Sequence, residues 1–439
     1  MKKIDENLFL NYSIDEIKLL LEKEEINANQ ILKLFLLKIK KYHKYNFLTK
    51  SSQKLLESKN FKVSNNSNSK CSLGGIPFLA KDIINTIQYN TEMGSGIWKG
   101  FRAGNNARII DSLLEDGAVL MGKSTTAEFA VHHETSGINP HDSNRIPGTS
   151  STGSAIAVSL GIVPFALGTQ TAGSLSRPAS YNGVWALKPS FGLIPRTGVL
   201  KTCDTLDTIG FVSSKLENMK TILESLRVKG ENYPFVFENI DQKKQAIIKN
   251  PNIAFIKTAV WDNLEDYTKI EINRYIDELK KKYSNIQEIK LDSEFNDIHK
   301  HHSIIYQKSL SYYFMREKKS GRKISAAMKN LIKKGEAISN SDYFNSLGKQ
   351  KYLCEKIEKV LKNFDLIISP ATCGIAPKKN ELEKDDASLI WTFLHLPLVF
   401  APLFKGPGNL PFGLHFLTKK WGDFDLINIL DTLRKDGCV

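Results

Sequence analysis

The segment 168–180, GTQTAGSLSRPAS, places small hydroxyl residues and glycines in front of an Arg-Pro pair and could hold a reactive serine. It is not a flexible linker, because the apolar stretches VPFALG and YNGVWALKPSFG flank it. Gly168 and Gly173 have the spacing of a phosphate-binding loop, but Ser174 and Leu175 stand where that loop needs Lys and Ser or Thr. The sequence therefore predicts a tight turn with Ser174 at its tip, whose bare backbone N–H groups favour an oxyanion.

A serine becomes a good nucleophile only when a neighbouring group removes its proton. There is no G-x-S-x-G elbow, and no histidine lies near Ser174 in sequence, although a distant one could approach it in space. Lys81 closes the apolar stretch IPFLAK, where desolvation could lower a lysine pKa from about 10.4 toward neutrality. A second small-residue loop, PGTSSTGS (147–154), places Ser150 and Ser151 where a helix begins. A Ser-Lys arrangement is a known variant of the catalytic triad.

Both loops occur in an order that resembles a known family. The stretches GGIPFLAKD and PGTSSTGSAIAVSLGIVPFALGTQTAGSLSRPASYNGVWALKPSFGLIPRTGV are similar to the motifs of the amidase-signature family, which are G-G-S-S-G-G-S, G-T-D-T-G-G-S-I-R-x-P and G-L-K-P. The similarity is collinear over residues 70–215 and resumes at DLIISPATCGIAPKK and IWTFLHLPLVFAPLFKGPGNLPFGLHFL. The resemblance implies an amidase, a hydrolase that acts on linear amide C–N bonds.

The resemblance also implies roles for single residues. Lys81 matches the catalytic lysine, Ser150 the bridging serine and Ser174 the nucleophile. In this family the bridging serine precedes a cis peptide bond. Neutral Lys81 would take a proton from Ser174 through Ser150, and Ser174 would attack a small carboxamide. The resulting acyl-enzyme would give a carboxylic acid plus ammonia or an amine. The oxyanion would rest on the N–H groups of Thr171, Ala172, Gly173 and Ser174.

Further residues surround this predicted triad. We expect Asp82 to hydrogen-bond loop amides, Arg177 to fix the Ser174 loop through a buried polar contact, and Asp204 and Asp207 to be turn and cap residues. A methionine or an aromatic residue in such segments more often packs than binds a ligand. The candidate substrate-binding residues are Met93, Gly94, Ser95, Ser151 and Trp391.

Three departures from the commonest motif bear on the type of amidase. Gln170 replaces the frequent Asp, Ala172 replaces the first Gly of G-G-S, and Arg177 lies three residues after the serine. These departures favour a free-standing amide hydrolase over the A-type glutaminase subunit of a tRNA-dependent amidotransferase. A catalytically silent scaffold is a third alternative, which the retention of all three triad residues opposes.

The elements that must position these residues indicate an α/β fold. Apolar patterns predict strands at 76–83, 118–125, 163–169, 364–372 and 410–417, and helices at 31–42, 106–119 and 153–161. We expect a single amidase-signature domain over 1–439, with a large mixed β-sheet core covered on both faces by helices. Its parts are an N-terminal helical segment (1–60), a catalytic core (70–215), a variable helical portion (216–360) and a return to the core sheet (361–430).

The composition limits partners and cofactors. With 41% hydrophobic residues, no run of 18 apolar residues and acidic residues near the N-terminus, the sequence predicts a soluble, cytoplasmic protein without a membrane partner. The net charge is +14, but only ten of the 61 basic residues are arginines, which argues against a nucleic-acid partner. Five scattered cysteines and the lack of an H-E-x-x-H motif indicate reduced thiols and no metal or other cofactor. A homodimer is left open.

Overall fold

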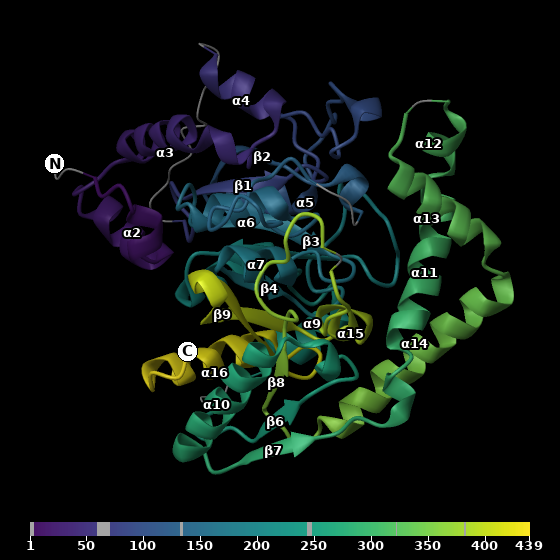
Figure 1. Ribbon diagram of the computed structural model, residues 1–439. Helices are drawn as coiled ribbons and strands as arrows, with labels where there is room; N and C mark the ends of the chain where they lie inside the picture. Colours follow the sequence, from purple (N-terminus) through teal and green to yellow (C-terminus); the bar gives the residue numbers. More distant parts are fainter. Residues whose placement is uncertain (1–3, 59–70, 132–134, 244–247, 322, 382) are drawn as a thin grey trace.

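The computed structural model of the protein describes residues 4–58, 71–131, 135–243, 248–321, 323–381 and 383–439. Within these ranges a ten-stranded sheet forms the centre of the molecule, with the strand order β2-β1-β3-β5-β4-β9-β10-β8-β6-β7 (Figure 1). The strands are β1 (Pro77–Lys81), β2 (Val119–Ser124), β3 (Phe165–Gln170), β4 (Trp185–Lys188), β5 (Thr208–Ser213), β6 (Ile253–Ile256), β7 (Ile286–Ile289), β8 (Leu366–Pro370), β9 (Leu398–Gly406) and β10 (Leu410–Leu417).

The sheet is parallel at both ends and antiparallel in the middle. β1 pairs in parallel with β2 and β3, and β6 pairs in parallel with β7 and β8. From β3 through β5, β4, β9 and β10 to β8, each strand is antiparallel to the next. This arrangement confirms the large mixed sheet expected from the sequence.

Helices cover both faces of the sheet (Figure 1). They are α1 (Leu8–Asn11), α2 (Ile14–Glu22), α3 (Ala28–Tyr42), α4 (Lys50–Glu57), α5 (Arg108–Glu115), α6 (Thr152–Ser159), α7 (Ser176–Asn182), α8 (Met219–Leu226), α9 (Pro234–Val236), α10 (Asp266–Lys282), α11 (Ile298–Tyr313), α12 (Met315–Lys319), α13 (Ala326–Ala337), α14 (Asn340–Val360), α15 (Ser388–Phe393) and α16 (Asp423–Lys435). On one face, α6 and α7 pack with Leu79 of β1, while α5, α8 and α16 share a core with Phe78 on the other. Since successive strand side chains point to opposite faces, both sides of β1 are buried.

The predicted elements around the triad are present. Each of the five predicted strands overlaps an observed strand, namely β1, β2, β3, β8 and β10, and the predicted helices correspond to α3, α5 and α6. β1 lies between β2 and β3, so the two loops that carry the predicted serines start from neighbouring parts of the sheet. The sequence therefore predicted the elements that hold these loops.

The expected helical portion, residues 216–360, differs from the prediction in one respect. It contains α8–α14, but it also contributes β6 and β7, which extend the sheet at its edge. Both strands have only four residues, and β7 is partly exposed, so their apolar pattern is too short to stand out from the helices. Helices α11–α14 lie together beside the sheet, in green in Figure 1.

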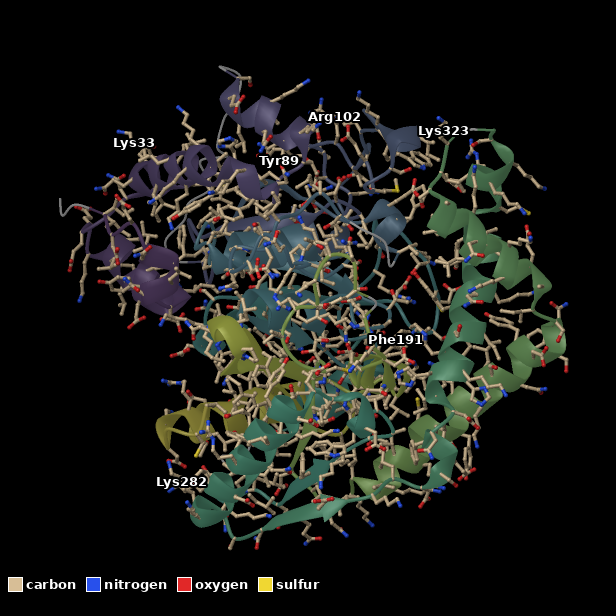
Figure 2. All side chains as sticks on the ribbon, viewed as in Figure 1. Lys33, Tyr89, Arg102, Phe191, Lys282 and Lys323 are labelled. Carbon is tan, nitrogen blue, oxygen red and sulfur yellow. The ribbon has the colours of Figure 1, made fainter. Side chains whose placement is uncertain are left out.

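Surface lysines are spread over the molecule. Lys33, Lys282 and Lys323 belong to distant segments, are exposed, and lie at different edges of the view in Figure 2. Among the described helices, none is both long and apolar enough to span a bilayer. In the same part of the chain, no group of three or more His, Cys, Asp and Glu side chains is arranged to hold a metal ion.

Candidate active site

Lys81, the last residue of β1, is fully buried and surrounded by hydroxyl groups. Its Nζ donates to Ser150 Oγ at 2.5 Å, to Thr169 Oγ1 at 2.8 Å and to Ser151 Oγ at 3.1 Å. Burial lowers the pKa of Lys81 to about 7, against an opposing contribution from the charge of Asp207. Near neutral pH much of this amine is therefore uncharged and able to accept a proton.

Ser150 lies in the loop before α6 and has a left-handed backbone, with φ of 70°. Its Oγ accepts from Lys81 and lies 3.0 Å from the carbonyl oxygen of Ala130, to which it can donate. Phe129 and Ala130 also have positive φ values, 51° and 59°. The described residues contain no cis peptide bond, so the expectation of a cis bond after Ser150 is wrong. The chain turns here through the left-handed conformation of Ser150 instead.

Ser151, predicted to bind substrate, is fully buried and connects the two serine loops. Besides accepting from Lys81, its Oγ donates to Thr169 O at 3.2 Å and accepts from Thr169 N at 3.3 Å. Its own N–H donates to Ser174 O at 3.2 Å. These contacts bring the loop that carries Ser174 against the Lys81–Ser150 pair.

The carbonyl groups of the predicted oxyanion loop all point to protein donors. Each of the four accepts one hydrogen bond, over 2.8 to 3.2 Å. The pairs, acceptor first, are Thr171 O with His302 Nε2, Ala172 O with Thr392 Oγ1, Gly173 O with Arg177 N, and Ser174 O with Ser151 N. Since a carbonyl only accepts, His302 carries its proton on Nε2, and burial lowers its pKa to about 4, which keeps the ring neutral.

The N–H groups of the same four residues, 171–174, are not bonded to protein acceptors, unlike their carbonyl groups. None of them donates to another residue in the described ranges, and Ser174 Oγ has no hydrogen-bond partner there either. A loop with its carbonyl oxygens tied away and its N–H groups bare can stabilise a negative oxygen. It can do so beside the only unbonded hydroxyl of this loop, that of Ser174.

Gln170, the residue that departs from the family motif, anchors the turn after Ser174. Its Oε1 accepts from Leu175 N at 3.0 Å, Ser176 N at 2.9 Å and Ser176 Oγ at 3.1 Å. Its Nε2 donates to Thr392 Oγ1 at 2.9 Å. Two backbone donors require an acceptor, so the amide oxygen faces them. Gln170 and Ser176 thus form a neutral contact across the turn.

Two carboxylates hold the loop from outside. Asp207 accepts from Thr171 Oγ1 at 2.7 Å and from Thr202 N at 2.7 Å, which fits its predicted role as a turn and cap residue and adds a contact to the oxyanion loop. Arg177 Nε lies 2.5 Å from Asp386 Oδ2, and the two side chains are only 11% and 3% exposed. The buried polar contact expected for Arg177 is confirmed.

The remaining substrate-binding candidates have protein partners of their own. Trp391 is fully buried, and its indole donates to Ser369 Oγ at 3.1 Å. Ser95 Oγ donates to Glu128 Oε1 at 2.8 Å. Met93 is buried and Gly94 is exposed, and both have positive φ values. A substrate would reach the Trp391 ring only by displacing core side chains.

Two hollows lie near these residues. One is lined by Ala130, Thr169, Thr171 and Asp207, among others, and holds about 10 Å³, close to the space of one water molecule. A larger cavity of about 630 Å³ is lined in part by Tyr181, which is on the same helix as Arg177. No predicted triad residue lines this second cavity.

Sequence reasoning missed two supports of the loop, His302 on α11 and Thr392 on α15. Both are more than a hundred residues away from the carbonyls that they hold. A histidine outside any ligand motif is indistinguishable from an ordinary core or surface residue, so no local signal could have found His302.

Several known proteins are similar to this chain over most of its length. A family model described as Amidase matches residues 30–427. The A subunit of the glutamyl-tRNA(Gln) amidotransferase of Sulfolobus acidocaldarius is 27% identical over 84% of this chain and 87% of its own length. A crystal structure described as that of an amidase has a TM-score of 0.82 at 21% identity, covering 97% of this chain and 100% of its own. The crystal structure of the same amidotransferase component from Thermotoga maritima has a TM-score of 0.81 at 22% identity, covering 99% and 96%.

Proposed function

The chain belongs to the amidase family and is an amide-hydrolysing enzyme, and we propose that it cleaves a carboxamide through an acyl-enzyme on Ser174, with Ser150 and Lys81 relaying the proton. The observation that carries the proposal is the fully buried Lys81, which has no carboxylate partner among the described residues and contacts Ser150 at 2.5 Å. The four N–H groups of residues 171–174, which have no protein acceptor among the described residues, also support the proposal, because they can bind the oxyanion formed from the substrate carbonyl.

In the proposed reaction, protons pass between Ser174, Ser150, Lys81 and the leaving nitrogen. Ser174 Oγ bonds to the amide carbon while its proton passes to Ser150 Oγ, and the Ser150 proton passes to neutral Lys81. The carbonyl oxygen becomes an oxyanion on the N–H groups of residues 171–174. When the C–N bond breaks, Ser150 gives a proton to the leaving nitrogen and regains one from Lys81. A water molecule then releases the carboxylic acid by the same relay and restores Ser174.

A fluorophosphonate probe tests the proposal without knowledge of the substrate. Ser174 Oγ would displace fluoride from phosphorus, so the wild-type protein should be labelled on the tryptic peptide that contains Ser174. Ser174→Ala should abolish labelling, and Lys81→Met and Ser150→Ala should slow it by about 1000-fold or more, as in other triads. Circular dichroism and melting curves of each variant check folding. Equal labelling of wild type and Lys81→Met would contradict the relay.

The biological setting is a separate question, and the curated relatives favour the glutaminase component of an amidotransferase. Relatives named as the A subunit of glutamyl-tRNA(Gln) amidotransferase match 81–96% of this chain at 24–28% identity. We therefore propose the side-chain amide of glutamine as the first substrate to test. The free-standing amidase favoured by the sequence is the second candidate, supported by the neutral Gln170–Ser176 contact and by Ala172 in the oxyanion loop.

Ammonia release distinguishes these settings. The purified chain is incubated with glutamine and, separately, with a panel of primary and substituted amides, and ammonia and acid are measured independently. A glutaminase component should turn over glutamine slowly alone and faster with the B subunit of an amidotransferase. Rapid turnover of other amides by the chain alone, with no response to a B subunit, would support the free-standing amidase.

A further inference from the structure

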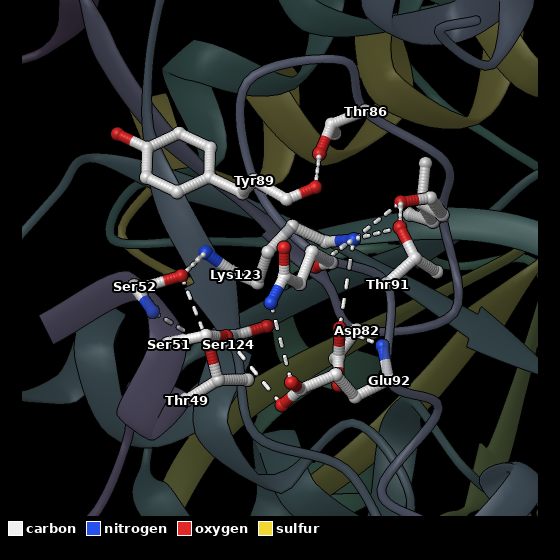
Figure 3. A network of polar contacts seen from close by, with 12 residues as sticks. Thr49, Ser51, Ser52, Asp82, Thr86, Tyr89, Thr91, Glu92, Lys123 and Ser124 are labelled. Atoms are coloured by element: carbon white, nitrogen blue, oxygen red, sulfur yellow. Dashed lines mark hydrogen bonds and ion pairs between the residues drawn. The ribbon is translucent and has the colours of Figure 1, made fainter. Parts of the chain in front are cut away.

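A second fully buried lysine, Lys123 on β2, lies close to the proposed triad but takes no part in the proposed chemistry. Its Nζ donates to Ile84 O at 2.5 Å and to Thr91 Oγ1 at 2.9 Å. It lies 3.6 Å from Asp82 Oδ1, in an ion pair in which both side chains are almost completely buried. In Figure 3, dashed lines join the amine of Lys123 to Asp82 and to Thr91.

Asp82 in turn holds the loop that follows β1. Its carboxylate accepts from Glu92 N at 3.1 Å and from Gly94 N at 3.5 Å, and its own carbonyl accepts from Met93 N at 2.9 Å. Asp82 was expected to hydrogen-bond loop amides, and these contacts confirm that expectation. Met93 has a φ of 55°, so the loop adopts a conformation that a non-glycine residue avoids unless its surroundings hold it.

This loop reaches Ser150 through one further turn. Met93 O accepts from Phe129 N at 2.8 Å, and the next residue, Ala130, presents its carbonyl oxygen to Ser150 Oγ at 3.0 Å. The left-handed conformations of Phe129 and Ala130 aim this carbonyl. A continuous series of contacts therefore runs from Lys123 and Asp82 to the hydroxyl of Ser150.

The neighbouring residues Lys81 and Asp82 thus reach Ser150 from two directions. Their side chains diverge, as expected for successive residues at a strand end: Lys81 contacts the loop before α6, and Asp82 contacts β2. Lys81 meets Ser150 Oγ directly, whereas Asp82 acts through the 91–95 loop and Ala130. The second route depends on a charged Asp82, since a carboxylate accepts at both oxygens.

We propose that Lys123 and Asp82 are positioning residues: through Ala130 they hold Oγ of Ser150 beside Lys81, and the proton that Ser150 donates to Ala130 O in this structure turns to Nζ when Lys81 is neutral. This inference rests on the proposed function, because it assigns Ser150 to the relay. Lys123 supplies the positive charge that keeps Asp82 ionised in its buried position. Removing one partner of a buried ion pair leaves the other charge uncompensated, and the loop contacts then weaken.

The titration of the pair is consistent with this role. Burial raises the pKa of Asp82 to about 6 and lowers that of Lys123 to about 8, each against the influence of the other charge. Both groups are therefore charged between these values, the range in which Lys81 begins to lose its proton.

The test compares probe labelling at Ser174 in Asp82→Asn, Lys123→Met and the double variant. Each single change should lower the labelling rate constant by about 10- to 100-fold, the size expected for a misplaced catalytic group. Since both residues act through one route, the double variant should be no slower than the worse single variant. With an amide substrate, kcat should fall while KM stays close to its wild-type value.

Lys188→Met is the matched control. Lys188 is also fully buried and also bonds to carbonyl groups, those of Leu396 and Pro189, which lie outside the route to Ser150. The Lys188→Met variant should lose about as much thermal stability as Lys123→Met and should be labelled at the wild-type rate. Should Lys123→Met fail to fold, Thr91→Val removes one acceptor of Lys123 and should give a smaller loss of rate in the same direction.

The outcomes separate this inference from the proposed function. If Ser174 is labelled in the wild type and Lys81→Met is not, but Asp82→Asn and Lys123→Met react at the wild-type rate, only the positioning role is overturned. The same holds if Lys188→Met slows labelling as much as Lys123→Met, because the effect is then one of general stability. If the wild type does not react at all, the relay and the positioning role fall together.

Discussion

At the scale of single residues, the environment of Lys81 determines what it can do. The nearest groups are three hydroxyls, which can exchange hydrogen bonds with either form of the amine but offer no charge to hold the proton. This is why burial dominates and lowers the pKa to about 7. A lysine on the surface would stay protonated at neutral pH and could not act as a base.

This environment predicts the pH dependence of catalysis. The proposed relay needs neutral Lys81, and the proposed positioning needs charged Lys123, so kcat/KM should rise with pH through an apparent pKa of about 7 and fall again above about 8. The measurement is kcat/KM, or the labelling rate, from pH 5 to pH 9. Lys81→Arg is the control, because a guanidinium keeps its proton throughout and should be inactive at every pH. A profile that is flat from pH 5 to 9 would exclude Lys81 as the base.

The sequence predicts the residues that lie within its motifs. Lys81, Ser150, Ser151 and Ser174 could be named because their small neighbours and strand ends are local patterns. His302 and Thr392 could not, since each is an ordinary residue of a helix and gains its role only from a contact across the fold. The ion pair between Asp82 and Lys123 is likewise invisible until β1 and β2 are placed side by side.

At the scale of elements, the turn between β3 and α7 depends on a side chain rather than on backbone pairing. The N–H groups of Leu175 and Ser176 are buried at the start of α7, and Gln170 Oε1 is their acceptor. A helix start that is buried needs such a partner. The departure from the family motif therefore keeps an acceptor for these groups while removing a charge.

Gln170→Met should consequently destabilise the turn. The change leaves two buried N–H groups without an acceptor, at a cost of roughly 1–3 kcal/mol each, and frees the loop that carries Ser174. Urea denaturation should show the loss of stability, and probe labelling should slow. Gln350→Met is the control, since Gln350 is equally buried on α14 but bonds to Thr205 O and Phe393 O, away from the turn. An unchanged labelling rate in Gln170→Met would show that the turn holds without it.

The sequence predicted several fully buried strands but missed the edge strand β7, because these strands differ from β7 in burial. β1, β3, β8 and β10 are buried on both faces and appear as continuous apolar runs. β7 lies at the edge of the sheet, where half of its residues are exposed, and its sequence IQEI resembles a turn of the helices around it. Because β7 buries only part of its surface, it folds into the sheet without a continuous apolar run.

At the scale of the whole molecule, the sheet brings the candidate site together from distant parts of the chain. Lys81, Ser150 and Ser174 come from the first half, whereas His302, Asp386 and Thr392 come from the second. The second half is therefore not only a variable addition, since His302 of α11 and Thr392 of α15 hold carbonyl groups of the proposed oxyanion loop. Truncation after the catalytic motifs would remove these supports.

The uncompensated burial of Lys81 also couples folding to protons. In the unfolded chain this amine has an ordinary pKa of about 10.4, so between pH 7 and pH 10 unfolding takes up a proton that the folded protein has released. Stability from this group is lowest below pH 7 and recovers as the pH rises. The whole shift corresponds to a cost of about 5 kcal/mol.

Lys81→Met removes this linkage and leaves all other titrating groups in place. The free energy of unfolding of the variant minus that of the wild type should be about 3 kcal/mol larger at pH 7 than at pH 9.5, measured by urea denaturation at both values. Loss of the hydrogen bonds to the three hydroxyls shifts both values equally and does not alter the trend. A difference independent of pH would mean that Lys81 stays protonated when folded. If the prediction holds, the contribution of Lys81 makes the protein easier to unfold on the acid side of pH 7. In that pH range the proposed base is also protonated and cannot accept a proton.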